Sequence, residues 1–393
     1  MDQFLATTAH KLRTNDYSEL TIVLGNESCD LDSAVSAIVY AMFLSWQYEQ
    51  IKCKVCTKTQ RDEKGYKDNI FVPVLDVARS DYNLKTEVAY CLRENGASDE
   101  NLLFRNDIDM KTLLASNKTK IILVDHHILS KRYNYLSPYV TEIIDHRPID
   151  RKEWTYKDDT RSTIETVGSC ATLVAQRIKD LSSLIKKDVD FFTAFPECTD
   201  LLHCAVVLDT VNFCKEVNKG TAHDKEIVLF LESIIKPDDN ELLRKSKLDR
   251  LVAARSDVTH LTASELLKKD VKVVGDVLVP SFPVPVKEFL KKPGALLAVA
   301  EALVERDCTL ALLLGMRLCP GLQRDAAVYA PNARRKAEKL AKHLQDCVSP
   351  SFQLVVEDSE LKLDCLYFSQ ANLLLTRKQY MPVLAEFLQH YKD

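Results

Sequence analysis

The chain has 393 residues, more than one hydrophobic core usually holds, so we expect two domains. Hydrophobic residues make up 46% of the sequence and charged residues 28%, which excludes a largely disordered protein. The formal net charge is −4, from 53 Lys+Arg against 57 Asp+Glu, so the surface as a whole is not built to hold nucleic acid and any anion-binding site must be local.

The sequence also bears on the cellular compartment. No run of eighteen apolar residues occurs and the N-terminus lacks the apolar core of a secretory signal, so we expect no membrane association. The twelve cysteines lack the spacing of a disulfide framework, which favours a reducing compartment. Cys53 and Cys56 form a Cys-x-x-Cys pair without a second metal-binding pair, so we interpret them as ordinary thiols. We predict a cytoplasmic protein, and the basic N-terminal residues leave a mitochondrial presequence open.

Up to residue 233, short β-branched runs alternate with longer helical patterns. The runs expected to form strands are residues 20–26, 69–77, 119–127 and 139–147. This alternation predicts an α/β fold with a parallel sheet. Polar residues that end buried strands of such a sheet lie at its carboxyl edge, where ligands bind. In this sequence those residues are acidic or imidazole side chains.

The second half of the chain has a different pattern. Residues 234–248 lose the apolar period and gather charge, so we predict a linker between a domain at 1–233 and a domain at 249–393. The second domain is predicted to be smaller and mixed α+β. Its expected elements are a helix at 262–270, strands within 271–280 and 308–318, a hairpin at 351–370 and a final helix at 381–391.

Four acidic motifs recur in the first domain, at the ends of predicted strands or helices. They are Asn26-Glu-Ser-Cys-Asp30-Leu-Asp32-Ser33, Asp125-His126-His127, Asp145-His146-Arg147 and Leu208-Asp209-Thr210. Taken alone, an Asp in such a place is more often a helix cap, and a His-His pair is more often part of the surface. Together they indicate metal binding, because close carboxylates repel each other unless cations lie between them. Two divalent ions about 3.5–4 Å apart are the usual solution in phosphoryl hydrolases.

The order of these motifs resembles the DHH phosphoesterase superfamily, and within it the prune-type exopolyphosphatases, which are related to family II inorganic pyrophosphatases. In the second domain, Asp270-Val-Lys272 and Thr376-Arg377-Lys378-Gln379 are similar to the cationic motifs of the DHHA2 domain of those enzymes. The resemblance covers nearly the whole chain. It implies a DHH metal-binding domain, a DHHA2 substrate-binding domain and an active site in the cleft between them.

The resemblance also implies roles for single residues. Two divalent ions would be bound, with Mg²⁺ preferred and Mn²⁺ or Co²⁺ as alternatives, and a water deprotonated between them would be the nucleophile. Asp125 would bridge the two ions. The phosphate-binding residues would be Arg147, Lys272, Arg377 and Lys378. The metal ligands would be Asn26, Asp30, Asp32, Asp125, His146 and Asp209.

Two positions depart from the pyrophosphatase pattern, and the prune branch shares both changes. Asn26 stands where those enzymes use a His ligand, which substitutes a hard oxygen and favours Mg²⁺. Arg147 stands where they use a second His, which suits a longer, more anionic substrate but removes a proton donor. His127 is then a candidate for protonating the leaving group, and His126 is expected to support the metal ligands through hydrogen bonds. The residues expected to act in catalysis are therefore Asp125, His127 and Arg147.

The predicted function is metal-dependent hydrolysis of short-chain inorganic polyphosphate, with pyrophosphate as a further candidate substrate. One alternative is a cyclic-nucleotide phosphodiesterase, because the same two metals could attack a diester. Another is a regulatory scaffold that binds other proteins, although a scaffold would be free to lose ligands and this chain has kept them. The oligonucleotide-cleaving branches carry a glycine-rich loop, whereas no two glycines are adjacent here, so we expect no nucleic acid substrate. Protein partners cannot be read from the sequence.

Overall fold

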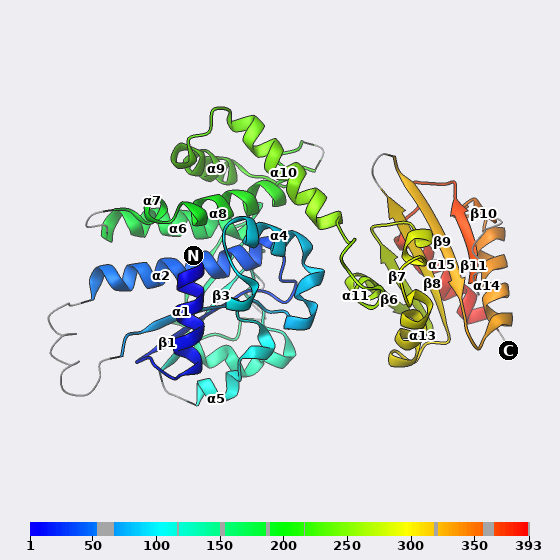
Figure 1. Cartoon of the computed structure of the whole chain (residues 1–393), viewed down its shortest axis with the longest axis horizontal. Coiled ribbons are helices and arrows are strands. Elements are labelled where there is room, and N and C mark those ends of the chain that lie inside the picture. The colour runs from blue at the N-terminus through cyan, green and yellow to red at the C-terminus, as the bar shows by residue number, and fades with distance from the viewer. Residues whose placement is uncertain are drawn as a thin grey trace. The chain divides into compact units, whose positions relative to one another are not determined.

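The computed structural model divides the chain into two units, Met1–Arg255 and Ser256–Asp393, which are described separately (Figure 1). Cys53 and Cys56, interpreted above as ordinary thiols, lie outside the residues that the structure describes. Those are residues 1–52, 67–115, 118–149, 154–185, 189–215, 217–317, 321–356 and 365–391.

The first unit is an α/β domain built on a five-stranded parallel sheet with the strand order β2-β1-β3-β4-β5. Its strands are β1 (Leu20–Leu24), β2 (Ile70–Val74), β3 (Thr119–Val124), β4 (Val140–Asp145) and β5 (Arg161–Ile164). Its helices are α1 (Asp2–Arg13), α2 (Leu31–Ile51), α4 (Thr86–Glu94), α5 (Met110–Leu114), α6 (Cys170–Ile185), α7 (Phe191–Ala194), α8 (Pro196–Asp209), α9 (Ala222–Ile235) and α10 (Asn240–Ser256), with 3-10 helices η1 (Arg79–Leu84), η2 (Asp99–Asn101), η3 (Arg105–Asp107) and η4 (Lys131–Tyr139). The predicted parallel α/β fold is confirmed.

Both faces of this sheet are covered. On β3, Ile122 and Val124 join the core beneath α2, α6 and α8, whereas Ile121 and Leu123 join the core formed with α5 and η4 (Figure 1). This alternation follows from the period of two along a strand. Helix α2 is apolar on almost every side because it packs against β1 and β2 as well as α6 and α8.

The order of the strands determines where a ligand site can form. From β1 the chain runs outward to β2 and then returns to β3 on the other side of β1. The segments that follow β1 and β3 therefore leave the sheet in opposite directions. In open parallel sheets the carboxyl edge at such a reversal is the usual ligand site. The residues that follow these two strands belong to the first two acidic motifs, at Gly25–Asp30 and Asp125–His127.

The second unit holds a mixed six-stranded sheet with the order β10-β11-β9-β8-β7-β6, in which β7 and β8 pair in parallel and the other described neighbours pair antiparallel. The predicted mixed domain is confirmed. Residues 271–280 form most of a hairpin, because Gly275 takes a positive φ of 56° between its strands. The strands are β6 (Val271–Val274), β7 (Val277–Phe282), β8 (Leu310–Arg317), β9 (Gln323–Tyr329), β10 (Leu354–Val356) and β11 (Cys365–Gln370), and the helices are α11 (Ala263–Lys269), α12 (Val286–Phe289), α13 (Ala295–Glu305), α14 (Arg334–Asp346) and α15 (Arg377–His390).

The predicted linker at 234–248 differs from the structure. Most of these residues belong to the end of α9 and the start of α10, and both helices lie in the first unit, which continues to Arg255. Helix α10 lacks a clear apolar period because one of its buried positions is charged. Lys247 is buried and donates a hydrogen bond to Asp200 on α8. The charged segment is therefore an anchored helix rather than a linker.

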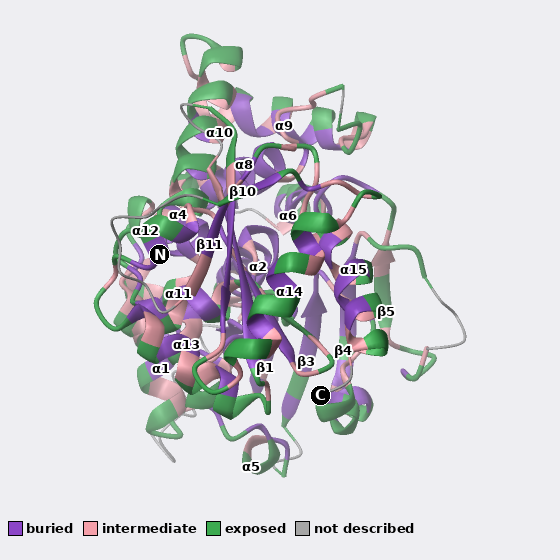
Figure 2. Ribbon diagram, turned by 90° about the vertical axis from the view of Figure 1, so that its right-hand side faces the viewer, coloured by how far each residue is buried: buried purple, intermediate pink, exposed green. Residues whose placement is uncertain are grey.

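Burial follows the layers of each unit. In Figure 2 the strands β1 and β3 are buried along most of their length, and α14 buries one side and exposes the other. The buried side of α14 carries Ala337, Leu340, Ala341 and Leu344, the spacing of one helical face. Among the described residues, none of the helices is long and apolar enough to cross a membrane.

Candidate metal centre

The first motif forms a tight loop between β1 and α2. Asp30 is the N-cap of α2, and its carboxylate accepts the Ser33 amide at 3.1 Å. The Ser33 hydroxyl in turn accepts the amide of Asn26 at 2.7 Å. A Cβ at Gly25 would overlap Ser33, so only glycine lets the loop approach the helix this closely. The loop thereby places Asp32 in the first turn of α2, where it is buried.

Asp32 is fixed by a second helix. Its carboxylate accepts the Ser169 hydroxyl at 2.8 Å and the amides of Cys170 and Ala171 at 2.6 and 2.7 Å, all at the N-terminus of α6. Amides at a helix N-terminus favour a negative charge. Gly168 allows this packing, since a Cβ there would lie 2.8 Å from Thr210 Cγ2. The carboxylate is therefore oriented before any ligand arrives.

Asp125 and His146 come from the ends of β3 and β4. Asp125 has a left-handed backbone, with φ of 61°, and its amide donates to the Ile144 carbonyl at 2.9 Å. His146 Nδ1 donates to the Val167 carbonyl at 2.9 Å, which leaves Nε2 as the ring atom with a lone pair. This Nε2 atom lies 3.2 Å from Asp125 Oδ1 and 3.9 Å from Asp32 Oδ2.

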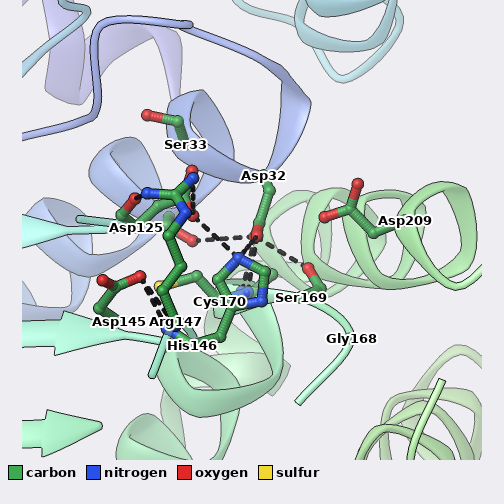
Figure 3. A network of polar contacts seen from close by, with 12 residues as sticks. Asp32, Ser33, Asp125, Asp145, His146, Arg147, Gly168, Ser169, Cys170 and Asp209 are labelled. Atoms are coloured by element: carbon green, nitrogen blue, oxygen red, sulfur yellow. Dashed lines mark hydrogen bonds and ion pairs between the residues drawn. The ribbon is translucent and has the colours of Figure 1, made fainter. Parts of the chain in front are cut away.

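Asp32, Asp125 and His146 form a group in which one ligand atom from each residue lies within 4.8 Å of the others (Figure 3). Two carboxylate oxygens and one imidazole nitrogen suit a divalent ion such as Mg²⁺, Mn²⁺ or Zn²⁺. Other carboxylates and amide oxygens could complete the coordination.

The raised pKa values of these three residues show that negative charge is crowded in this group. Burial and the charge of Asp32 raise the pKa of Asp125 to about 8, and burial also raises the pKa of Asp32. Burial opposes the charged form of His146, but the hydrogen bond to Asp125 and the charge of Asp32 raise its pKa to about 9. The group thus holds protons where ordinary carboxylates hold none, and a divalent ion would replace them. The residues present fit a metal ion.

Asp209 lies at the end of α8, on the other side of Asp32 from Asp125 (Figure 3). Burial and the charge of Asp32 raise its pKa well above the usual range. It lies outside the group of three, and Lys219 Nζ approaches its Oδ1 at 3.8 Å. Asp30, which caps α2, also lies outside that group. Their roles as metal ligands stay predictions.

Asn26 differs from the expectation that its oxygen binds metal. Its Oδ1 accepts the amides of Ser28 and Cys29, at 2.9 and 3.2 Å, and the Ser28 hydroxyl at 2.6 Å. Its Nδ2 donates to both the backbone and the carboxylate of Asp125. The reverse amide orientation would set the NH₂ group against two amide donors. In this geometry Asn26 positions Asp125 and offers no free oxygen.

The two histidines of the second motif contact residues at the ends of β3 and β4. His127 is buried, and its Nδ1 contacts Asp145 Oδ2, while Asp145 Oδ1 accepts the His146 amide at 2.8 Å. A donor to a leaving group must reach the substrate, and this enclosed ring instead positions Asp145. His126 donates from Nδ1 to the Val124 carbonyl at 3.0 Å and so supports the turn that carries Asp125, in line with its predicted supporting role.

The four predicted phosphate-binding cations are divided between the units. In the first unit, the half-exposed Arg147 donates to the Asp125 carbonyl at 2.6 Å. In the second, Arg377 at the start of α15 pairs with Asp270 at 2.6 Å, while Lys272 on β6 and Lys378 are exposed. Substrate binding by these four residues stays a prediction.

Sequence reasoning missed Lys219, and no periodic signal points to it. The chain takes positive φ at three successive residues after α8, Val211, Asn212 and Phe213. A β-branched residue rarely adopts this conformation. The turn returns the chain, and Gly220 permits close contact with Phe213. Lys219 thus lies 3.8 Å from the Asp209 carboxylate.

Comparisons with known proteins are consistent with this geometry. The family model described as "DHH family, N-terminal domain" matches residues 21–206, and the model of the DHHA2 domain matches residues 249–387. The chain is 32% identical over 385 residues to "Exopolyphosphatase PRUNE1" of Rattus norvegicus, covering 95% of this chain and 76% of the relative. It is 32% identical over 381 residues to the Homo sapiens protein of the same name, covering 95% of this chain and 77% of the relative.

Proposed function

The chain belongs to the DHH family, carries a DHHA2 domain and has exopolyphosphatases among its relatives, and we propose that it hydrolyses short inorganic polyphosphate with divalent ions bound at Asp32, Asp125 and His146. It is an exopolyphosphatase-type hydrolase. The finer parts of the proposal are the metal ligands, the phosphate-binding residues and the preference for short chains.

The observation that carries the proposal is the group of three donors at the reversal of strand order. Each donor is held by its scaffold: Asp32 by the amides of α6, Asp125 by Asn26, and His146 by the Val167 carbonyl. Orientation by such hydrogen bonds is typical of metal sites. The raised pKa values of Asp125 and His146 support the proposal that a cation binds here. We also propose Asp30 and Asp209 as ligands that complete the coordination of two ions.

When bound, divalent ions supply Lewis acidity that activates water and neutralises phosphate charge. The residues of this chain then contribute positioning. Asn26 and Arg147 each donate to the backbone carbonyl and to the carboxylate of Asp125, so the carboxylate keeps one orientation. Arg147 is half-exposed and can turn its guanidinium to phosphate oxygens, which its fork geometry fits.

In the second unit we propose that Lys272 and Lys378 bind substrate phosphates, since both are exposed cations in the matching DHHA2 motifs. Arg377 is anchored by Asp270 and keeps part of its guanidinium committed to that pair. We therefore assign it a weaker share of the substrate contact than its neighbour. The two exposed lysines can rearrange around a phosphate without breaking an internal ion pair.

Phosphate release from a panel of substrates tests the proposal. The panel contains tripolyphosphate, tetrapolyphosphate, long-chain polyphosphate, pyrophosphate and cyclic AMP, each with Mg²⁺ and with a chelator. We expect release from tripolyphosphate that needs the metal. Release from cyclic AMP alone would favour the phosphodiesterase alternative. A folded protein that binds no divalent ion in calorimetry and releases no phosphate would leave the scaffold alternative.

A further inference from the structure

The second unit contains a cavity of about 540 Å³ that the proposed function does not use. It lies at the edge of the sheet where β7, β8 and β11 end. These ends coincide because β7 is parallel to β8, while β8 and β11 are both antiparallel to β9. The side chains that define its charge are Lys287, Glu288, Lys291, Arg317, Arg324 and Asp325.

The two acidic residues of the cavity are already compensated. Asp325 is buried, and its carboxylate accepts the amides of Val286 and Lys287, at 2.8 and 3.2 Å, and the Tyr367 hydroxyl at 2.9 Å. These donors stabilise the negative charge locally. Glu288 pairs with Arg317. Glu288 is therefore cancelled by Arg317, whereas Asp325 keeps its formal charge but points it at neutral donors.

Three cations remain, and one of them is fixed in place. Arg324 donates from Nε to the Leu373 carbonyl at 2.9 Å, which orients its guanidinium and leaves both terminal nitrogens for other acceptors. Lys287 and Lys291 are exposed at the rim. Within the described part of the chain, no carboxylate is paired with these three side chains. The cavity thus carries four basic and two acidic side chains, a formal net charge of +2, around one preoriented guanidinium.

A short turn and a strand pairing connect the cavity with the cationic motif of the same unit. Leu373, which fixes Arg324, lies in the short turn between β11 and Arg377 at the start of α15. Lys272 lies on β6, paired with Val279 of β7, and β7 ends at the same edge as the cavity. An extended anion bound by the motif could therefore continue along this edge.

We propose that this cavity binds a phosphoanhydride chain, taking the distal phosphates of polyphosphates longer than those held by Lys272 and Lys378. The proposal rests on the proposed function for its substrate. A guanidinium with two free terminal nitrogens matches the oxygens of a phosphate group, and two mobile ammonium groups can follow the next phosphates. The volume accommodates several phosphate groups. The triphosphate of a nucleotide offers the same chemistry and is the second source of ligand.

Equilibrium binding to the full chain tests the cavity directly. Fluorophore-labelled polyphosphate of about twenty phosphates is titrated with chelator present, so that hydrolysis does not interfere. The double variant Lys287→Ala with Lys291→Ala alters exposed side chains only, and Arg324→Gln probes the fixed cation. The control is Arg335→Ala with Lys342→Ala, which removes two exposed charges from α14. We expect affinity at least about tenfold weaker in the cavity variants and less than about twofold weaker in the control, since only the cavity variants remove charge-assisted contacts with phosphate.

Competition and turnover separate the possible sources. Displacement of the label by long polyphosphate and not by ATP assigns the cavity to polyphosphate, whereas displacement by ATP at equal concentration assigns it to nucleotides. In turnover, the cavity variants should lose kcat/KM for long chains and keep it for tripolyphosphate. Equal losses in the cavity and control variants, or no loss in either, would overturn the proposal. A wild type that binds polyphosphate through the cavity but releases no phosphate would refute the proposed function and leave the cavity site standing.

Discussion

The metal centre of the first unit and the cationic edge of the second, formed by Lys272 and Lys378, stabilise charged groups in opposite ways. The centre is buried, and its carboxylates are fixed by amides, hydroxyls and an imidazole. The edge is largely exposed, and Lys272 and Lys378 end in flexible ammonium groups. Buried charges must have their partners built in, because desolvation without a partner is costly, whereas exposed cations remain solvated until a ligand arrives.

This difference determines what each region can tolerate. In the centre, Asp125 holds contacts with Asn26, His146 and Arg147 at once, so a single substitution disturbs several groups. At the edge, each lysine acts nearly alone. We therefore expect large and coupled effects of substitution in the first unit, and smaller, more separable effects in the second.

The largest effect is expected for Asp125→Ala. Removing the carboxylate shared by the group should abolish tight binding of divalent ions and lower kcat for tripolyphosphate by at least about a thousandfold, because metal-assisted charge stabilisation is worth several kcal/mol. Calorimetric titration with Mg²⁺ and phosphate release measure the two losses.

Asp158→Asn is the matched control, since Asp158 is an exposed acid of the same unit and should behave as wild type. Unaltered metal affinity in a folded Asp125→Ala protein would place the metal centre elsewhere. It would also contradict the expected difference between coupled substitution effects in the first unit and separable effects in the second.

An effect of at least about tenfold is expected for Lys378→Ala and for Lys272→Ala in kcat/KM for tripolyphosphate, since about 1.4 kcal/mol of lost transition-state binding is a factor of ten. Metal affinity should not change. Arg377→Ala should show a smaller kinetic loss than either lysine variant and in addition a lower melting temperature, because it breaks the pair with Asp270. Lys268→Ala, an exposed lysine on α11, serves as the control. Wild-type kinetics in both lysine variants would place the substrate elsewhere.

The sequence was sufficient for those parts of the fold and site that depend on local pattern. Runs of β-branched residues predicted the first four strands. Asp125 and His146, which come directly after two of those strands, belong to the group of possible metal ligands. Parallel order then brings the strand ends together without further information. The short strand β5 is half-exposed and lacks a strong apolar run, which explains why it escaped prediction.

The sequence could not show which way a side chain turns. Asn26 has the right place for a ligand, but the amides of Ser28 and Cys29 claim its oxygen. His127 was a candidate proton donor because it lies two residues after Asp125, yet its ring contacts Asp145 in the interior. The same limit applies to α10, where the buried position of Lys247 makes an anchored helix look like a charged linker.

A smaller effect, on metal affinity, is expected for Asn26→His. On sequence alone, imidazole at this position should shift metal preference from Mg²⁺ towards Mn²⁺ or Co²⁺. The structure instead predicts an unchanged ranking and an affinity about fivefold weaker for each ion, because the hydrogen bond that orients the Asp125 carboxylate is lost at a cost of about 1 kcal/mol. Parallel titrations with Mg²⁺ and Mn²⁺ decide between the two. A reversed ranking would show that residue 26 binds the metal, and the centre would then resemble the pyrophosphatase pattern.

The smallest effect is expected for Lys219→Ala. Lys219 lies 3.8 Å from Asp209 and is half-exposed, so it resembles the exposed cations of the second unit although it lies beside the centre of the first. Its ammonium competes with a metal ion for Asp209, and an exposed pair contributes roughly 0.2–1 kcal/mol, so metal affinity should rise about twofold to threefold. Lys225→Ala, on the exposed side of α9, should leave it unchanged. If kcat/KM for tripolyphosphate instead falls about tenfold at constant metal affinity, Lys219 binds substrate phosphate, and the division between a buried anionic centre and an exposed cationic edge does not follow the boundary between the units.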